Sequence, residues 1–210
     1  DFPFGLPREF VLAHQLSSTA DEVITTLHQR CPTRMAFRAL VDAWGNTRPP
    51  GQRLLHRATD TALPGISSTS PLQTRYVPVG FMYYEGFSRL VASHVHAPGL
   101  RDGDPQRVAL EGYPGLLAFE LLGRRSYKND DSPERLLARK DMVEALEQGR
   151  TRLGLRLKLT PAQAGELVAD SSGDRLDAVL CLMQAGWAHT QPAYGQPAEV
   201  TALEGWITSA

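Results

Sequence analysis

The chain has 210 residues, of which 42% are hydrophobic and 21% are charged. This composition is typical of a globular protein whose core is large enough to be stable without disulfides or metals. The net charge of −1 excludes a protein that binds nucleic acid or a membrane surface through its overall charge, so any phosphate-binding role must be local.

The compartment is predicted from the cysteines and from apolar runs. Cys31 and Cys181 have no partner at metal-ligand spacing, which favours a reduced protein. No run approaches the roughly 18 apolar residues that cross a bilayer, and no secretory leader is visible. We therefore expect a cytoplasmic protein without a membrane partner. The chain begins at Asp1 and not at Met, so we also expect that strands upstream of it are missing.

The N-terminal half is expected to be rich in helices. Pro7 suits the first position of a short helix, and residues 18–30 combine a Ser or Thr cap with an apolar stripe at helical spacing. The same spacing predicts helices over 35–45 and 78–93. Between them, residues 46–76 form a long connection rich in Pro, Gly and Ser, which is typical of a lid or mobile segment.

The C-terminal half is expected to contain one strand and several helices. A short apolar run over 107–111 predicts a strand that ends at Glu111 or Tyr113. Pro114 begins a helix that Gly123 ends. Further helices are expected over 133–148, 161–169 and 174–189. Helices that alternate with a few strands predict an α/β or α+β fold, in a single domain over 1–210.

Two carboxylates, Asp174 and Asp177, lie one turn apart at the start of the last expected helix. Neighbouring carboxylates on a helix can hold a hard divalent cation such as Mg²⁺. Asp is also favoured in the first turn of a helix because it caps free N–H groups and offsets the helix dipole. The pair therefore has two interpretations, as a metal site or as a cap.

Two more acidic residues, Asp1 and Glu111, stand where strands are expected to end. In open α/β sheets, ligands bind outside the carboxyl ends of the strands. Carboxylates that gather in one crevice repel one another unless a cation compensates their charge. The acidic residues together therefore predict a metal as their partner.

Other patterns are open to more than one interpretation. His94 and His96 could hold Zn²⁺, although no further ligand cluster is near them in the sequence. Arg57 and Asp60 could bind phosphate or form an Asx-type turn. A group of basic residues could form a nucleic-acid face or a solvated helix surface: Arg124, Arg125, Arg135, Arg139, Lys140, Arg150 and Arg152. The aromatic group of Phe81, Tyr83, Tyr84 and Phe87 is expected in the core rather than as a base-stacking platform.

Five stretches, taken in order, resemble the family called domain of unknown function 429. They are Asp1–Pro7, Glu111–Pro114, Tyr127–Lys128 with the following Glu134–Arg135, Asp174–Ala178, and Glu204–Ile207. The resemblance covers the chain from end to end. Members of this family are described as predicted nucleases of the RNase H-like superfamily.

The resemblance implies an RNase H-like mixed sheet flanked by helices. Asp1 would match the central-strand position, Asp177 with Asp174 the helical one, and Glu111 the following strand. It also implies hydrolysis of DNA or RNA by two Mg²⁺ or Mn²⁺ ions ~3.5 to 4 Å apart. These carboxylates would be the catalytic groups, with Asp1, Asp174 and Asp177 as metal ligands.

The resemblance further implies that Lys128, Arg57 and Asp60 contact the substrate. The Asp of the family's first strand has no counterpart in this chain, which starts at Asp1. Two alternatives to a nuclease therefore stay open, a non-catalytic member that binds nucleic acid or a nucleotide, and an inactive fragment.

Overall fold

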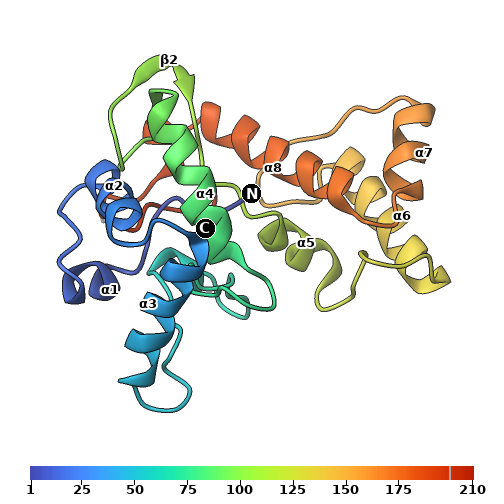
Figure 1. The fold of residues 1–210 in the computed structure, drawn as a ribbon. Helices are drawn as coiled ribbons and strands as arrows, with labels where there is room; N and C mark the ends of the chain where they lie inside the picture. Colours follow the sequence, from blue (N-terminus) through green and yellow to red (C-terminus); the bar gives the residue numbers. More distant parts are fainter. Residues whose placement is uncertain (199) are drawn as a thin grey trace. The chain divides into compact units, whose positions relative to one another are not determined.

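The computed structural model describes residues 1–198 and 200–210. These residues form eight α-helices: α1 (Arg8–Ala13), α2 (Ala20–Arg30), α3 (Arg34–Asn46), α4 (Val79–Ala92), α5 (Pro114–Leu122), α6 (Pro133–Gln148), α7 (Pro161–Ala169) and α8 (Asp174–His189) (Figure 1). Two short 3-10 turns, η1 (Thr59–Thr61) and η2 (Pro192–Gly195), accompany them. In the described chain the only sheet consists of two parallel strands, β1 (Val95–His96) and β2 (Asp104–Val108).

The predicted RNase H-like mixed sheet is wrong, because the described residues are mostly helical. A central strand needs a neighbour on each edge and apolar side chains on both faces, whereas four of the five side chains of β2 are exposed. β2 ends at Val108, so the last three residues of the strand predicted over 107–111 lie outside it. The opening segment 1–7 is not a strand. The backbone of these segments is bonded to loops instead, as in the bond from Leu6 N to Leu203 O of 3.3 Å.

The helix predictions are confirmed, and the expected local signals explain them. The Thr19 side chain accepts a hydrogen bond from Glu22 N at the start of α2. Thr160 and Gln163 form a capping box at the start of α7. Pro7 differs from its expected place, because it precedes α1 as the cap residue and not as the first helical residue.

The contacts of the described residues group into two compact units. One, which we call the 112–195 unit, also includes Asp1 and Ser209, and the other, the 2–111 unit, also includes residues 196–208 and Ala210. Each unit has its own hydrophobic core. The expected single domain stays a prediction, because two groups of contacts can belong to one folding domain or to two.

The core of the 2–111 unit is formed by α1 to α4, drawn in blue to green in Figure 1. Tyr83, Tyr84 and Phe87 on α4 are buried, as expected, and the Tyr84 ring stacks on Phe37 of α3 at 5.6 Å between centroids. The long connection over 46–76 contains η1 and contributes the fully buried Leu72. Part of this connection is therefore core and not a lid.

The core of the 112–195 unit lies where α5, α6 and α8 pack together, with α7 against α6. Leu117 of α5, Met142 of α6 and Leu180 of α8 are fully buried within it. This packing holds the first turn of α8, which carries Asp174 and Asp177, in a defined place next to the segment that joins α5 to α6.

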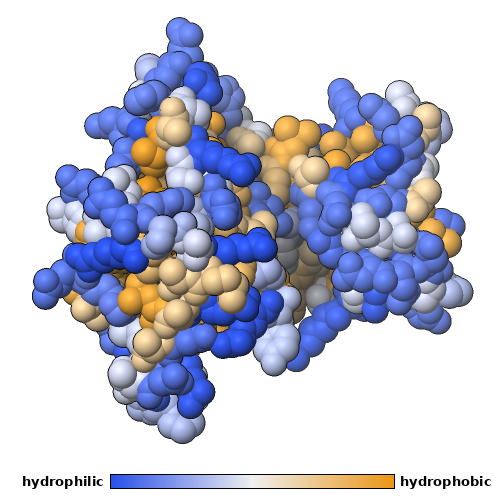
Figure 2. All heavy atoms as spheres, in the orientation of Figure 1, coloured by the Kyte–Doolittle hydropathy of each residue, from blue (hydrophilic) through white to orange (hydrophobic). Residues whose placement is uncertain are grey.

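The surface is mainly hydrophilic on the face drawn in Figure 2, with hydrophobic side chains in groups between the hydrophilic ones. Within the described residues, no helix is both long enough and apolar enough to span a bilayer. Cys31 and Cys181 are both free thiols.

Candidate functional site

The most distinctive polar cluster of the 112–195 unit surrounds the carboxylate of Asp177. Tyr127 donates a hydrogen bond from its phenol to Oδ1, and the Lys128 ammonium group donates to Oδ2. The side chain of Asp177 is 12% exposed and that of Lys128 is 30% exposed. Lys128 Nζ also lies 3.7 Å from Oδ1 of Asp174, whose side chain is 80% exposed. One ammonium group is therefore shared by two carboxylates, one of them nearly buried and the other open to solvent.

A glycine lets the chain segment of Lys128 approach α8 this closely. Gly173 precedes the helix with a φ of 76°, in the left-handed region where Gly has no steric penalty. A Cβ atom at this position would lie 2.7 Å from Lys128 Cγ and 3.2 Å from Tyr127 Cδ2. A side chain here would therefore push Tyr127 and Lys128 away from Asp177.

The phenol of Tyr127 is kept protonated. Burial raises its pKa, and the hydrogen bond to Asp177 raises the pKa further. The group can therefore act as a permanent donor that fixes one oxygen of Asp177.

The structure excludes the cap interpretation for Asp177, and the metal interpretation stays a prediction. Two of the free N–H groups at the start of α8 donate to other side chains, since Asp170 Oδ2 accepts from Arg175 N at 2.9 Å and Ser172 Oγ accepts from Asp174 N at 3.2 Å. The two carboxylate oxygens of Asp177 accept hydrogen bonds from Tyr127 and Lys128 instead. It is therefore a partner of the Tyr127–Lys128 segment and not a helix cap.

Arg139, which was expected on a solvated basic face, is buried and positions this segment. Its side chain is 1% exposed, and its Nη1 donates to the carbonyl oxygens of Tyr127 at 3.0 Å and Asp130 at 3.2 Å. Its Nε donates to Val168 O at 2.7 Å. The sequence contained a signal for this, because the buried Met142 lies three residues further along α6, on the same face.

The expected metal site is assembled only in part. Among the described residues, no group of three or more His, Cys, Asp or Glu side chains could hold a metal ion. Asp1 belongs to the same unit as Asp174 and Asp177 but does not complete such a group with them. The latter two alone offer hard carboxylate oxygens, and one or two carboxylates are what Mg²⁺ usually takes from a protein. The donor set of this pair therefore fits Mg²⁺ or Mn²⁺, with waters and a substrate phosphate as further ligands.

The other three predicted residues form a separate cluster in the 2–111 unit. Arg57 Nη2 lies 2.8 Å from Asp60 Oδ1 and 2.6 Å from Glu111 Oε1, and Arg57 Nη1 donates to Glu111 Oε2 at 2.8 Å. The side chains are 1% exposed for Arg57, 0% for Asp60 and 4% for Glu111. Phe4 N donates to the same Oε2 at 2.8 Å. The cluster therefore joins three distant parts of the unit in one buried network.

The charges of this network compensate one another. Burial alone would lower the pKa of Arg57, but the carboxylates of Glu111 and Asp60 outweigh that effect and raise the pKa, so the guanidinium stays charged. Both oxygens of Glu111 are already bonded, and Arg57 and Asp60 are shielded from solvent. The structure places Arg57, Asp60 and Glu111 in a buried network that joins parts of the fold, and the catalytic role of Glu111 and the substrate contacts of Arg57 and Asp60 stay predictions.

No protein-family model, no curated protein and no solved structure matches this chain.

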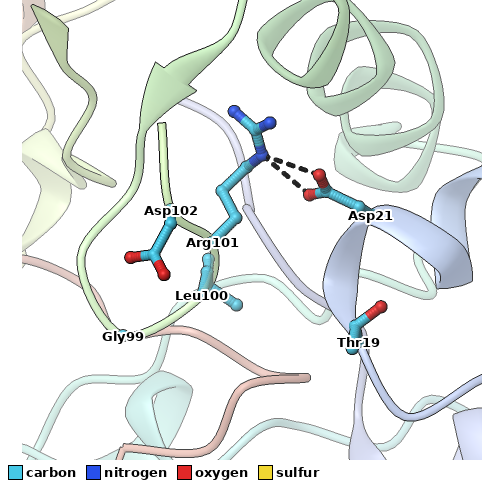
Figure 3. Close-up of a pocket in the computed structure, with 6 residues that line it drawn as sticks. All are labelled: Thr19, Asp21, Gly99, Leu100, Arg101 and Asp102. Atoms are coloured by element: carbon cyan, nitrogen blue, oxygen red, sulfur yellow. Dashed lines mark hydrogen bonds and ion pairs between the residues drawn. The ribbon is translucent and has the colours of Figure 1, made fainter. Parts of the chain in front are cut away.

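A polar pocket of about 480 Å³ lies elsewhere in the 2–111 unit, between the start of α2 and the 99–102 turn. Figure 3 shows that the Arg101 guanidinium is directed toward Asp21, while Asp102 points away from this pair. Arg101 Nε lies 2.7 and 3.0 Å from the two Asp21 oxygens, and Nη1 donates to Val95 O. The pocket therefore contains a guanidinium that is already neutralised.

His94 and His96, for which zinc binding was one of several open interpretations, lie near this pocket. His94 has a φ of 55°, and His96 Nδ1 lies 3.8 Å from Asp102 Oδ1. The described residues offer no third ligand to this pair.

Proposed function

We propose that this chain is a Mg²⁺- or Mn²⁺-dependent phosphodiesterase that hydrolyses DNA or RNA. Asp174 and Asp177 would be the metal ligands, and Lys128 would contact a substrate phosphate. The observation that carries the proposal is the position of Lys128 Nζ, which is ion-paired with Asp177 and lies 3.7 Å from Asp174. Two carboxylates one helical turn apart favour a positive charge between them, and a divalent cation would satisfy both more strongly than one ammonium group.

The roles of the chain's own residues follow from their contacts. Tyr127 holds Oδ1 of Asp177, so this carboxylate stays in one orientation. Lys128 carries a compact charge on a flexible stem, and it can leave the carboxylates for a phosphate oxygen when another cation replaces it. The bound ion would supply Lewis-acid activation of the phosphate and a more acidic water.

Asp1 lies in the same unit as the pair but forms no three-residue metal group with Asp174 and Asp177 in the described part of the chain, so the proposal rests on these two. Glu111 is left out, because its side chain is only 4% exposed and lies in a buried network with Arg57 and Phe4 N of the 2–111 unit. The sequence support for this activity is the resemblance of the ordered motifs to the domain of unknown function 429 family, and the RNase H-like fold of that family is not part of the proposal because the described residues are mostly helical. The free cysteines support action in the reducing cytoplasm.

A second candidate is a non-catalytic protein that binds nucleic acid or a nucleotide. It is favoured by the ion pair of Lys128 with Asp177, which already neutralises the buried carboxylate, and by the lack of a three-residue metal group in the described part of the chain. In this case Lys128 would contact a phosphate without a metal ion.

The two candidates differ in whether the chain cleaves a nucleic-acid substrate, as a phosphodiesterase would and a binding protein would not. The full chain should be incubated with labelled single-stranded, hybrid and branched substrates in the presence of Mg²⁺, Mn²⁺ or EDTA. We expect cleavage that EDTA abolishes and that Asp177→Asn lowers by about 100-fold or more, because a metal ligand is lost. Asp141→Asn is the matched control, since Asp141 forms an exposed ion pair with Arg125 in the same unit.

Three outcomes are informative. Cleavage that survives EDTA, or that Asp177→Asn leaves unchanged, contradicts the metal mechanism. Binding without cleavage, reduced by Lys128→Gln but not by Asp141→Asn, supports the second candidate.

A further inference from the structure

A groove of about 570 Å³ lies in the 2–111 unit between the C-terminal half of α3 and two stretches of the 46–76 connection. Its volume is within the usual range of small-molecule sites, about 300 to 1,000 Å³. The buried side chains of Val41 and Leu72, with the half-buried Leu54, form its apolar part. Polar side chains of both elements complete the lining, so the groove combines an apolar surface with groups that bind hydrogen-bonding ligands.

A close approach of the backbone shapes this groove. A Cβ atom built on Gly45 of α3 would lie 3.1 Å from Arg53 O and 3.4 Å from Arg53 Cβ. The absence of a side chain at this position lets the connection pack against the helix. The backbone of Arg53 is thereby held at the groove, while its side chain is exposed.

Two guanidinium groups line the groove, and only that of Arg75 has a partner among the residues that the structure describes. Arg75 Nη2 is paired with Asp42 Oδ2 at 2.6 Å, and both side chains are more than a third exposed. Within the described residues, the Arg53 side chain has no hydrogen bond or ion pair, although it lies at the groove. Because exposed ion pairs are weak, a phosphate could also attract Arg75. The two Arg residues against one Asp leave the lining with one excess positive charge, which suits an anion.

The remaining groups suit a flat, hydrogen-bonding ligand. Tyr76 is 91% exposed, so its ring is free to stack on an aromatic partner. In the described chain, the side-chain amide of Asn46 and the Gln73 amide nitrogen have no protein partner. Amides of this kind can pair with the donor and acceptor groups on the edge of a base.

We propose that this groove binds a nucleoside phosphate, with the base against Tyr76 and the apolar wall and the phosphate on Arg53. The same chemistry is offered by a free nucleotide and by one unit of a single-stranded nucleic acid. Binding here does not depend on phosphodiester hydrolysis at Asp177, so it would persist in a chain without that activity.

The test is calorimetric titration of the full chain with adenosine monophosphate, adenosine, inorganic phosphate and oligothymidylate. We expect Arg53→Gln to weaken binding of the monophosphate about tenfold and to leave binding of adenosine unchanged, because only a phosphate contact is lost. Tyr76→Ala should weaken binding of both about tenfold through lost stacking. Both side chains are exposed, so neither change should prevent folding.

Arg89→Gln is the matched control, since Arg89 is exposed on α4 and makes no side-chain bond within the described residues. The proposal is overturned if the natural chain does not bind the monophosphate, if Arg53→Gln behaves like Arg89→Gln, or if inorganic phosphate binds as tightly as the monophosphate. Oligothymidylate that binds tenfold more tightly than the monophosphate would identify a nucleic-acid strand as the ligand, and equal affinities would identify a free nucleotide. All titrations are run in EDTA, where the metal-dependent hydrolysis of the phosphodiesterase proposal does not occur, so a failure of one proposal is distinguishable from a failure of the other.

Discussion

The ammonium group of Lys128 is ion-paired with the nearly buried carboxylate of Asp177. The two residues lie 49 positions apart in the chain, and the pair forms because the segment after α5 packs against the first turn of α8. This relationship gives Asp177 a defined orientation and a positive partner in the absence of a metal ion.

Lys128→Met should therefore change metal affinity and stability in opposite directions. Removal of the ammonium group leaves the carboxylates of Asp174 and Asp177 without their cation, so the affinity for Mn²⁺ should rise. The free energy of unfolding should fall by about 1 kcal/mol, because the pair is partly exposed. Calorimetric titration with Mn²⁺ and urea denaturation measure the two effects. A variant that binds Mn²⁺ no more tightly than the natural chain would argue against metal binding at this pair.

Tyr127→Phe tests the hydrogen bond to the other oxygen of Asp177. We expect a loss of about 1 to 2 kcal/mol in the free energy of unfolding at neutral pH. Burial and this bond raise the pKa of the folded phenol above its ordinary value of 10.0. The protonated phenol therefore contributes fully to the free energy of unfolding below pH 10, and this contribution is lost as the pH rises above 10. Urea denaturation across this range should show a steeper loss of stability in the natural chain than in the variant. Tyr76→Phe, at an exposed ring, should keep the slope of the natural chain.

Glu111→Gln tests whether the buried network of the 2–111 unit stabilises the fold. The change leaves the charge of Arg57 compensated by Asp60 alone, in a place shielded from solvent. Breaking a buried ion pair costs about 3 to 5 kcal/mol, and urea denaturation should show a loss of this size. Asp141→Asn, at an exposed pair, should cost less than about 1 kcal/mol. Equal losses in the two variants would contradict the structural role of Glu111.

Arg139→Met tests the positioning of Lys128. The change removes three hydrogen bonds to carbonyl oxygens, those of Tyr127, Asp130 and Val168. We expect a loss of about 3 kcal/mol in the free energy of unfolding and faster amide hydrogen exchange over residues 127–131. Lys140→Met, at the next position of α6, is exposed and should change neither. Unchanged exchange in Arg139→Met would mean that Lys128 is held in place by other contacts.

Much of the secondary structure could be predicted from the sequence, because its causes are local. Thr19 and Thr160 mark helix starts through caps within their own first turn, and Pro114 marks another through its fixed φ. The sheet could not be predicted in this way. A strand at 107–111 would depend on partners elsewhere in the chain. In the described residues β2 pairs with β1 only as far as Val108, and beyond it Glu111 forms an isolated parallel bridge with Ile207.

The sequence by itself determined where the helices lie and which carboxylates start the last of them. Only the tertiary structure decided what those carboxylates contact. Glu111 is bonded to Arg57, 54 residues away in the sequence, and Asp177 to Lys128, 49 residues away. Neither pair could be predicted from the spacing of neighbouring residues. The physical reason is that burying a charge costs free energy unless an opposite charge is paired with it. Which residues come close enough to pair is decided by the packing of the whole chain.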